Sequence, residues 1–205
     1  LICDHNNLSG SLSSQLGRLT KLKTIALYGN AITGQIPRHL GSLESLVILS
    51  LGENQLSGTT PTEIGHLTSL SKLSLNNNKL VQSIPSEIGN LSHLSWLSFC
   101  NNKLTGSIPS QIGNLILVEY FDFGLNMLTG TIPSEIVNIY SMQEFNLVSN
   151  RITGTIPSGF GELVNLTMFD FGGNKMNGTI MSELGQLVNL KYLILFGLDL
   201  TGSIP

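Results

Sequence analysis

The amino-acid sequence predicts an α/β solenoid, a single elongated domain of stacked units that covers residues 1–205. Two observations carry this prediction. Apolar residues recur two apart in short segments, as on one face of a strand, and an asparagine returns every 24 residues, the step from Asn78 to Asn102. A unit this short cannot bury its own apolar face, so successive units must stack and share one core. The chain holds about eight full units and part of a ninth (205/24).

Each unit begins with a short strand. The copy from Leu94 to Pro109 shows the pattern, because Leu97 and Phe99 alternate with polar residues. We expect the strands of successive units to align in parallel along one side as a concave sheet.

The recurring asparagine follows the strand, where the chain turns inward and leaves backbone groups without partners. An amide side chain both donates and accepts hydrogen bonds, so a column of asparagines can satisfy these groups along the stack. Leu198 interrupts the column in the last unit. The predicted structural ladder consists of Asn30, Asn54, Asn78, Asn102, Asn126, Asn150 and Asn174.

The second half of each unit is a short extended segment followed by a 3₁₀ or short helical turn on the convex side. In Leu128–Pro133 the glycine permits a tight turn with positive φ. The proline is expected at the first helical position, which has no N–H partner to lose. Ser134–Ile136 then suits the start of a helical turn, with an apolar residue facing inward.

The complete pattern, L-x-x-L-x-L-x-x-N-x-L-T/S-G-x-I-P-x-x-L/I-G-x-L, resembles the plant-specific class of extracellular leucine-rich repeats over essentially the whole chain. The resemblance implies a right-handed superhelix and a receptor-like kinase or receptor-like protein ectodomain. It also extends to the polygalacturonase-inhibiting proteins. Matched copies of Gly-x-Ile-Pro stand at Gly34–Pro37, Gly106–Pro109, Gly130–Pro133, Gly154–Pro157 and Gly202–Pro205. Departures include Thr60 for Ile, Gln82 for Gly, Met181 for Pro and Leu198 for Asn.

Composition excludes several function classes. A net charge of −3 and a charged content of 11% argue against nucleic acid as a partner. No apolar run approaches the roughly 18 residues of a membrane span. The four histidines occupy unrelated repeat positions and form no catalytic or metal-ligand set with other residues, so we expect no enzyme activity, cofactor or metal.

Neither end of the chain carries a recognisable cap, so we expect a piece of a longer protein. Cys3 and Cys100 lie about four strands apart, roughly 19 Å, and are expected to be free thiols. Together with the resemblance, the N-x-S/T sequons favour an extracellular, cell-surface or apoplastic location. The candidate glycosylation sites are Asn7, Asn90, Asn165 and Asn177.

Outward positions on the concave sheet are free of core constraints and become aromatic and acidic from the fourth unit onward. An exposed Trp–Tyr pair beside carboxylates is typical of an interface that binds a peptide or protein. The acidic flank favours a partner that carries Lys or Arg. The alternative is that the aromatic residues only pack on neighbouring sheet side chains. The candidate ligand-binding residues are Lys72, Trp96, Tyr120, Asp122, Glu144, Asn146, Met168 and Asp170.

Hydroxyl residues flank the turn glycine in most units and predict two parallel ranks on a flat side of the solenoid. Such ranks resemble the faces of ice-binding solenoids, a group that includes some plant leucine-rich repeat proteins. The plain alternative is that these residues are the consensus of the subclass, and Val81–Ser83 interrupts the ranks. The alternative ice-binding residues are Thr105, Ser107, Thr129, Thr131, Thr153 and Thr155.

The leading hypothesis is a non-catalytic recognition module of a plant receptor. It would bind a peptide or protein ligand, or a co-receptor, on its concave or lateral surface. Ice binding by the hydroxyl ranks and inhibition of a secreted cell-wall-degrading enzyme remain as alternatives, because a fold does not determine a function.

Overall fold

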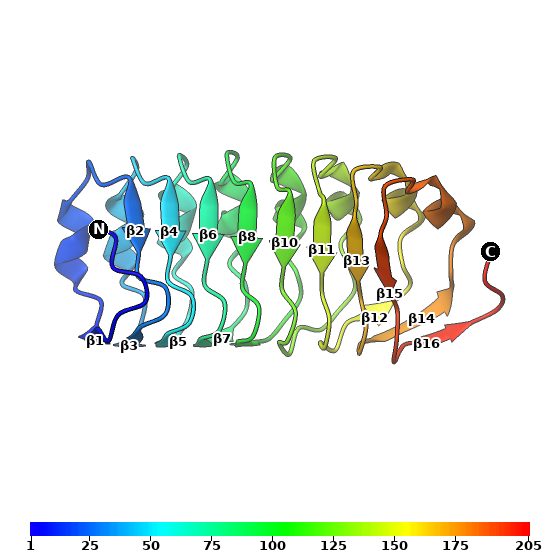
Figure 1. Cartoon of the computed structure of the whole chain (residues 1–205), viewed down its shortest axis with the longest axis horizontal. Helices are drawn as coiled ribbons and strands as arrows, with labels where there is room; N and C mark the ends of the chain where they lie inside the picture. The colour runs from blue at the N-terminus through cyan, green and yellow to red at the C-terminus, as the bar shows by residue number, and fades with distance from the viewer.

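A computed structural model describes the whole chain, Leu1–Pro205, as one solenoid whose concave side is a parallel eight-stranded sheet (Figure 1). Its strands follow each other in chain order, one per unit. They are β2 (Thr24–Ala26), β4 (Ile48–Ser50), β6 (Lys72–Ser74), β8 (Trp96–Ser98), β10 (Tyr120–Asp122), β11 (Glu144–Asn146), β13 (Met168–Asp170) and β15 (Tyr192–Ile194). The solenoid with a concave parallel sheet is therefore confirmed.

The strand register places residues one repeat apart directly opposite each other. Trp96 pairs with Lys72 on one side and with Tyr120 on the other, and Tyr120 pairs with Glu144. The side chains that the sequence assigns to one column of the concave face therefore do stand in one column.

The second extended segment of most units forms further parallel strands along one lateral side of the solenoid, at its lower edge in Figure 1. They make a five-stranded and a three-stranded sheet. The first comprises β1 (Ser9–Ser11), β3 (Ala31–Gly34), β5 (Gln55–Gly58), β7 (Lys79–Gln82) and β9 (Lys103–Leu104), and the second β12 (Thr153–Gly154), β14 (Lys175–Thr179) and β16 (Asp199–Thr201). Backbone hydrogen bonds continue across the interval between them, since the Thr129 N–H donates to the Gly106 carbonyl over 2.8 Å and the Thr153 N–H to the Gly130 carbonyl over 2.8 Å.

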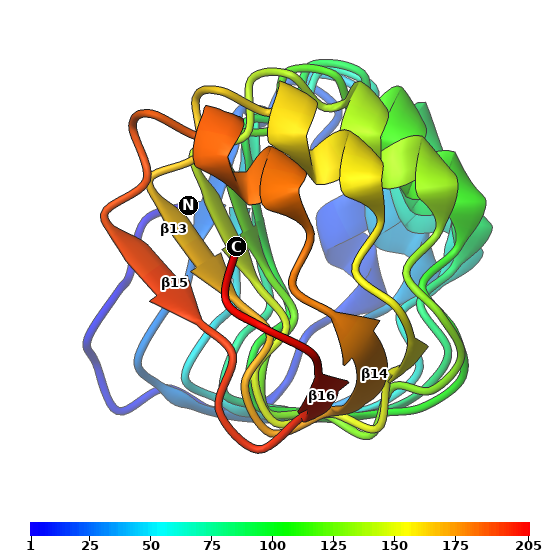
Figure 2. The ribbon, with the colours of Figure 1, turned by 90° about the vertical axis from the view of Figure 1, so that its right-hand side faces the viewer.

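The convex turns are all 3₁₀ helices, and Figure 2 shows them stacked across the core from the concave strands. Their bounds are η1 (Ser14–Arg18), η2 (Arg38–Ser42), η3 (Thr62–His66), η4 (Ser86–Asn90), η5 (Ser110–Asn114), η6 (Ser134–Asn138), η7 (Ser158–Glu162) and η8 (Ser182–Gln186). The prediction that the proline opens the turn from inside was wrong by one residue. Pro109 has an extended conformation, ψ 140°, and stands before η5, where its carbonyl accepts a hydrogen bond from the Ile112 N–H.

Glycine allows the convex turns to approach each other closely. A Cβ atom on Gly65 would lie 2.5 Å from the carbonyl oxygen of Glu87 in the next unit. The turn η6 has Val137 at the equivalent position, and there the facing residue is Gly159 in place of a glutamate. A Cβ atom on Gly159 would lie 3.0 Å from Val137 Cγ1, so the small residue of this pair has moved to the neighbouring turn.

One hydrophobic core runs through the stack without a break, from Ile25 to Leu187. Leucine and isoleucine fill it in the first units, and phenylalanine enters from the fourth unit. Phe121, Phe145 and Phe169 occupy equivalent strand positions and contact each other in series, with ring centroids 5.1 and 6.0 Å apart. Each unit thus completes the core of its neighbours, which a single unit cannot do.

The asparagine column links each unit to the previous one. The Asn102 amide nitrogen donates to the Leu75 carbonyl of the preceding unit and to the Phe99 carbonyl of its own, both over 3.0 Å. Its amide oxygen accepts a hydrogen bond of 3.0 Å from the Leu80 N–H. The same pattern recurs in the other units, and Asn54, Asn126, Asn150 and Asn174 are likewise buried. These side chains therefore replace water as the partner of backbone groups inside the stack.

Candidate concave binding site

Trp96 and Tyr120 form a stacked aromatic pair at the middle of the concave sheet. They come from the neighbouring strands β8 and β10, and their ring centroids lie 3.7 Å apart with planes inclined by 8°. The Trp96 side chain is 37% exposed, while Tyr120 is half-buried. An exposed indole that is stacked on a neighbouring ring offers a large apolar contact area, which is typical of an interface anchor.

A hydrogen bond to its own strand holds the Tyr120 side chain in place. Its hydroxyl donates to Asp122 Oδ2 over 3.2 Å, and Asp122 Oδ1 accepts a hydrogen bond of 3.0 Å from the Gly124 N–H. Burial and the neighbouring Asp122 carboxylate raise the pKa of the Tyr120 hydroxyl above its ordinary value. The phenol therefore remains protonated and continues to donate its hydrogen bond to Asp122, which holds the ring against the Trp96 indole.

The two aspartates of the middle column are buried, which corrects the expectation of an acidic flank open to a ligand. Asp122 and Asp170 are each 6% exposed. Their short side chains lie between longer ones and turn down to the backbone, where they accept from the N–H groups of Gly124 and Gly172. A carboxylate that is satisfied and covered in this way offers little surface to a basic partner.

Burial also raises the pKa of the Asp122 carboxyl, although hydrogen bonds from Gly124, Cys100 and Tyr120 oppose the shift. The folded state then binds this proton more tightly than the unfolded state does. The stability contributed by Asp122 is complete below the unfolded pKa of 3.8 and is lost as the pH rises through the raised folded value. Burial raises the pKa of Asp170 in the same direction, with a smaller contribution from the charge of Asp122.

Lys72 extends the aromatic column on the side away from Tyr120. Its ammonium nitrogen lies 4.8 Å from the centroid of the Trp96 ring, within the range of a cation–π interaction. Lys72, Trp96 and Tyr120 line a hollow of about 500 Å³ in the concave face. Asp122 lines the hollow as well, so four of the eight ligand-binding residues predicted from the sequence lie together here.

The other four candidates lie outside the hollow, toward the C-terminal units. Glu144 and Met168 continue the first column and are half-buried. The Asn146 amide oxygen accepts from the Val148 N–H over 2.9 Å, as the aspartates do from their glycines.

The lining of the hollow also contains residues that the sequence analysis did not select. Tyr28 and Asp4 belong to the first units, and Asn76 to the third. The Tyr28 N–H donates to Asp4 Oδ1 over 2.7 Å, and a hydrogen bond from its hydroxyl to Glu53 raises the pKa of that hydroxyl. The repeat could have identified two of these residues, because Tyr28 and Asn76 occupy equivalent outward-facing positions just after their strands.

The ranks of hydroxyl residues lie on the lateral side, near the second strands and the 3₁₀ turns. All six residues named as alternative ice-binding residues are exposed. The Thr153 hydroxyl is partly engaged, since it donates to the Gly130 carbonyl over 3.1 Å. Gln82 stands in the left-handed region with φ 67° where the other units have glycine, and its side chain interrupts the rank.

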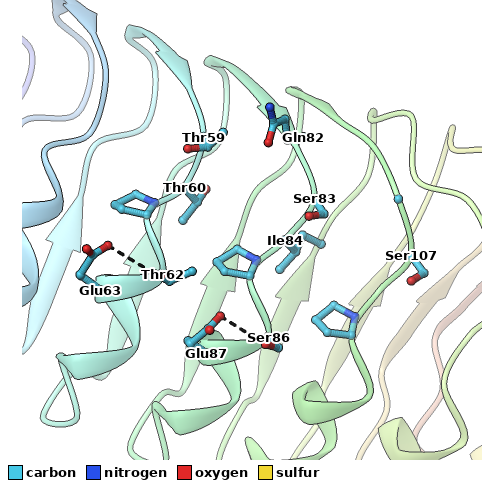
Figure 3. Close-up of a pocket in the computed structure, with 14 residues that line it drawn as sticks. Thr59, Thr60, Thr62, Glu63, Gln82, Ser83, Ile84, Ser86, Glu87 and Ser107 are labelled. Atoms are coloured by element: carbon cyan, nitrogen blue, oxygen red, sulfur yellow. Dashed lines mark hydrogen bonds between the residues drawn. The ribbon is translucent and has the colours of Figure 1, made fainter.

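A second hollow of about 790 Å³ opens on this lateral side (Figure 3). Hydroxyl groups, prolines and two glutamates line it, and the Ser86 hydroxyl donates to Glu87 over 3.2 Å. Thr60, which replaces the usual isoleucine, is 4% exposed and its hydroxyl has no hydrogen-bond partner. The consensus isoleucine at this position packs in the apolar core, where no polar group is available as a partner. The threonine that replaces it therefore has a buried hydroxyl without a hydrogen bond.

The asparagines of the candidate sequons differ in whether their side-chain amides are hydrogen-bonded to the chain. All four asparagines are exposed. The Asn165 amide nitrogen, however, donates to the Tyr140 carbonyl over 2.8 Å, which ties it to the preceding unit. Asn90, at the end of η4, makes no such bond.

No group of three or more His, Cys, Asp or Glu side chains is placed to hold a metal ion. Cys3 and Cys100 are free thiols, and burial raises the pKa of the Cys100 thiol to about 12. None of the helices combines the length and apolar character that crossing a bilayer requires.

Family models confirm the class of protein that this repeat defines. The model described as "Leucine rich repeat" matches residues 20–80, and a second described as "Leucine Rich Repeat" matches residues 93–115 and 141–163. Together they cover more than half of the chain, which therefore belongs to the leucine-rich repeat proteins. A search of curated proteins found no significant match.

Solved structures narrow the likeness to plant proteins. The plant peptide hormone receptor RGFR1 in complex with RGF2 is 33% identical, covers 100% of this chain and 33% of its own, and superposes with a TM-score of 0.95. A TDR receptor is 35% identical over 98% of this chain and 35% of its own, with a TM-score of 0.96. A plant ice-binding protein is 26% identical over 100% of this chain and 74% of its own, with a TM-score of 0.78. The chain thus spans about a third of the length of these receptors.

Proposed function

We propose that this chain is a non-catalytic recognition module that binds an extended peptide across its concave sheet, as part of a plant receptor ectodomain. The observation that carries the proposal is the Trp96–Tyr120 stack, exposed in a hollow of an otherwise rigid surface. Preformed surfaces lose little conformational entropy on binding, so a few aromatic anchors suffice for useful affinity. The similar receptor RGFR1, described as a peptide hormone receptor, supports the same kind of ligand for this chain.

The proposed ligand-binding surface consists of the aromatic column and its continuation. Lys72, Trp96 and Tyr120 make the primary contacts, and Glu144 and Met168 extend them toward the C-terminal units. Asp122 and Asp170 act from beneath as positioning residues, because their carboxylates bond to the backbone. An extracellular or apoplastic location follows from the receptor assignment, with Asn90 as the best sequon for a glycan.

Binding to a positional-scanning library of blocked dodecapeptides, measured by calorimetry, tests the proposal. We expect selected peptides to bind the wild-type chain and to lose most of their affinity for Trp96→Ala. The matched control is Tyr140→Ala, which removes an exposed aromatic residue outside the concave sheet and should leave affinity unchanged. Equal binding to Trp96→Ala and the wild type would contradict the assignment of this surface.

Ice binding is the second candidate, favoured by the exposed hydroxyl ranks and by the likeness to a plant ice-binding protein. Inhibition of ice recrystallisation by the purified chain tests it. If the ranks bind ice, replacing Thr129, Thr131, Thr153 and Thr155 by lysine abolishes the inhibition, and Trp96→Ala does not. Absence of inhibition by the unmodified chain would dismiss this candidate.

A further inference from the structure

Lys72 places a positive charge without an ion-pair partner in the concave hollow. Its aliphatic stem is half-buried and its ammonium group lies against the Trp96 ring, 4.8 Å from the centroid. The ammonium group makes no hydrogen bond or ion pair with any residue of the chain. Its neighbours in the same column, Ile48 and Trp96, are uncharged, so nothing on the adjacent strands neutralises it.

The acidic groups around the hollow are already engaged with other partners. Asp122 is buried and bonded to Gly124 and Tyr120, while Asp4 accepts from the Tyr28 N–H. Glu144 follows Tyr120 in the column, on the far side of the aromatic stack from Lys72. Lys72 is the only cation that lines the hollow, and its ammonium group is the charged group there that has no partner within the chain.

We infer that the hollow recognises an acidic side chain of the bound peptide through Lys72, with an apolar residue of the same peptide against the exposed edge of Trp96. This inference rests on the proposed function and names the chemistry of its ligand. It reverses the charge preference that the sequence suggested, because two of the three carboxylates that suggested it, Asp122 and Asp170, are buried and Glu144 lies outside the hollow. The geometry also sets the spacing in the ligand. Neighbouring strands lie about 4.8 Å apart, and an extended chain rises about 3.3 Å per residue with successive side chains on opposite faces. The acidic and apolar residues therefore stand two positions apart, so that both side chains face the sheet.

The same dodecapeptide library provides the test, with both peptide ends blocked so that only side chains carry charge. We expect selected peptides to contain Asp or Glu two positions from a large apolar residue. Changing that Glu to Gln in a selected peptide should weaken binding about tenfold, more than an exposed pair gives, because the lysine is half-buried. The loss should shrink at high salt.

Variants of Lys72 separate the contribution of its charge to peptide binding from the contribution of its aliphatic side chain. Lys72→Met keeps the stem over Trp96 and should bind the Glu and Gln peptides equally, whereas Lys72→Arg should restore the preference for Glu. Lys72→Glu should select Lys or Arg at the same peptide position. The control is Lys103→Met, an exposed cation on the second-strand side, which should leave the preference intact.

The outcomes separate this inference from the proposed function. If peptides bind and require Trp96, but the wild type binds Glu and Gln peptides equally, the inference is wrong and the function stands. If Lys72→Met keeps the preference for Glu, the acidic side chain is recognised elsewhere and the inference is again wrong. If no peptide of the library binds, both the function and the inference are overturned.

Discussion

Removing one asparagine of the ladder should uncouple two units of the stack. In Asn102→Ala the Leu80 N–H loses its 3.0 Å partner inside the structure, and the Leu75 and Phe99 carbonyls each lose one donor. A buried N–H without a partner costs about 1–3 kcal/mol, and each lost hydrogen bond a further ~1 kcal/mol. We therefore expect the free energy of unfolding to fall by about 3–5 kcal/mol, a large part of the stability of an ordinary domain.

Urea denaturation followed by circular dichroism gives this free energy. Trp96 is the only tryptophan and lies in the same unit as Asn102, so its emission shows whether that unit opens before the rest. The control is Asn114→Ala, which removes an exposed asparagine from η5 and should change the free energy by less than about 0.5 kcal/mol. A loss below about 1 kcal/mol for Asn102→Ala would refute the argument that these amides hold the units together.

Three further predictions concern positions that depart from the regular repeat. Thr60→Ile removes the unsatisfied hydroxyl and restores the consensus side chain, so urea denaturation should show a gain of about 1–2 kcal/mol. The reverse change at the equivalent site of the next unit, Ile84→Thr, should cost a similar amount, and a stable Ile84→Thr would contradict the argument. Gln82→Gly relieves a left-handed residue, φ 67°, and should add about 1 kcal/mol to the free energy of unfolding. No gain would mean that the Gln82 conformation carries no strain. Asp122→Asn copies the arrangement of Asn146 and should flatten the loss of thermal stability between acid and neutral pH. An unchanged pH profile would show that another group titrates.

Most of the fold could be predicted from the sequence, because a solenoid repeats one local solution. The period places Leu97 and Phe99 in the core and Asn102 at the turn, and these assignments need no knowledge of distant contacts. The strand register follows from the same period, which is why Trp96 and Tyr120 stand together.

Features that depend on how side chains cover one another were not predictable in this way. The period shows that Asp122 lies on the concave face but not that its carboxylate turns down to the Gly124 N–H and becomes buried. The exchange between Val137 and Gly159 likewise needs the distance between neighbouring turns. Tyr28 joins the hollow because its ring lies over Gly52 of the next unit, where a Cβ atom would come within 3.0 Å of the ring.

The emission of Trp96 during titration with a library-selected peptide tests the central claim most directly, since no other indole contributes to the signal. If the peptide sits on the concave column, the emission changes and saturates at the affinity found by calorimetry. Acrylamide then quenches Trp96 less efficiently in the complex than in the free chain. Heat of binding without any change in Trp96 emission or quenching would place the ligand elsewhere and contradict the account.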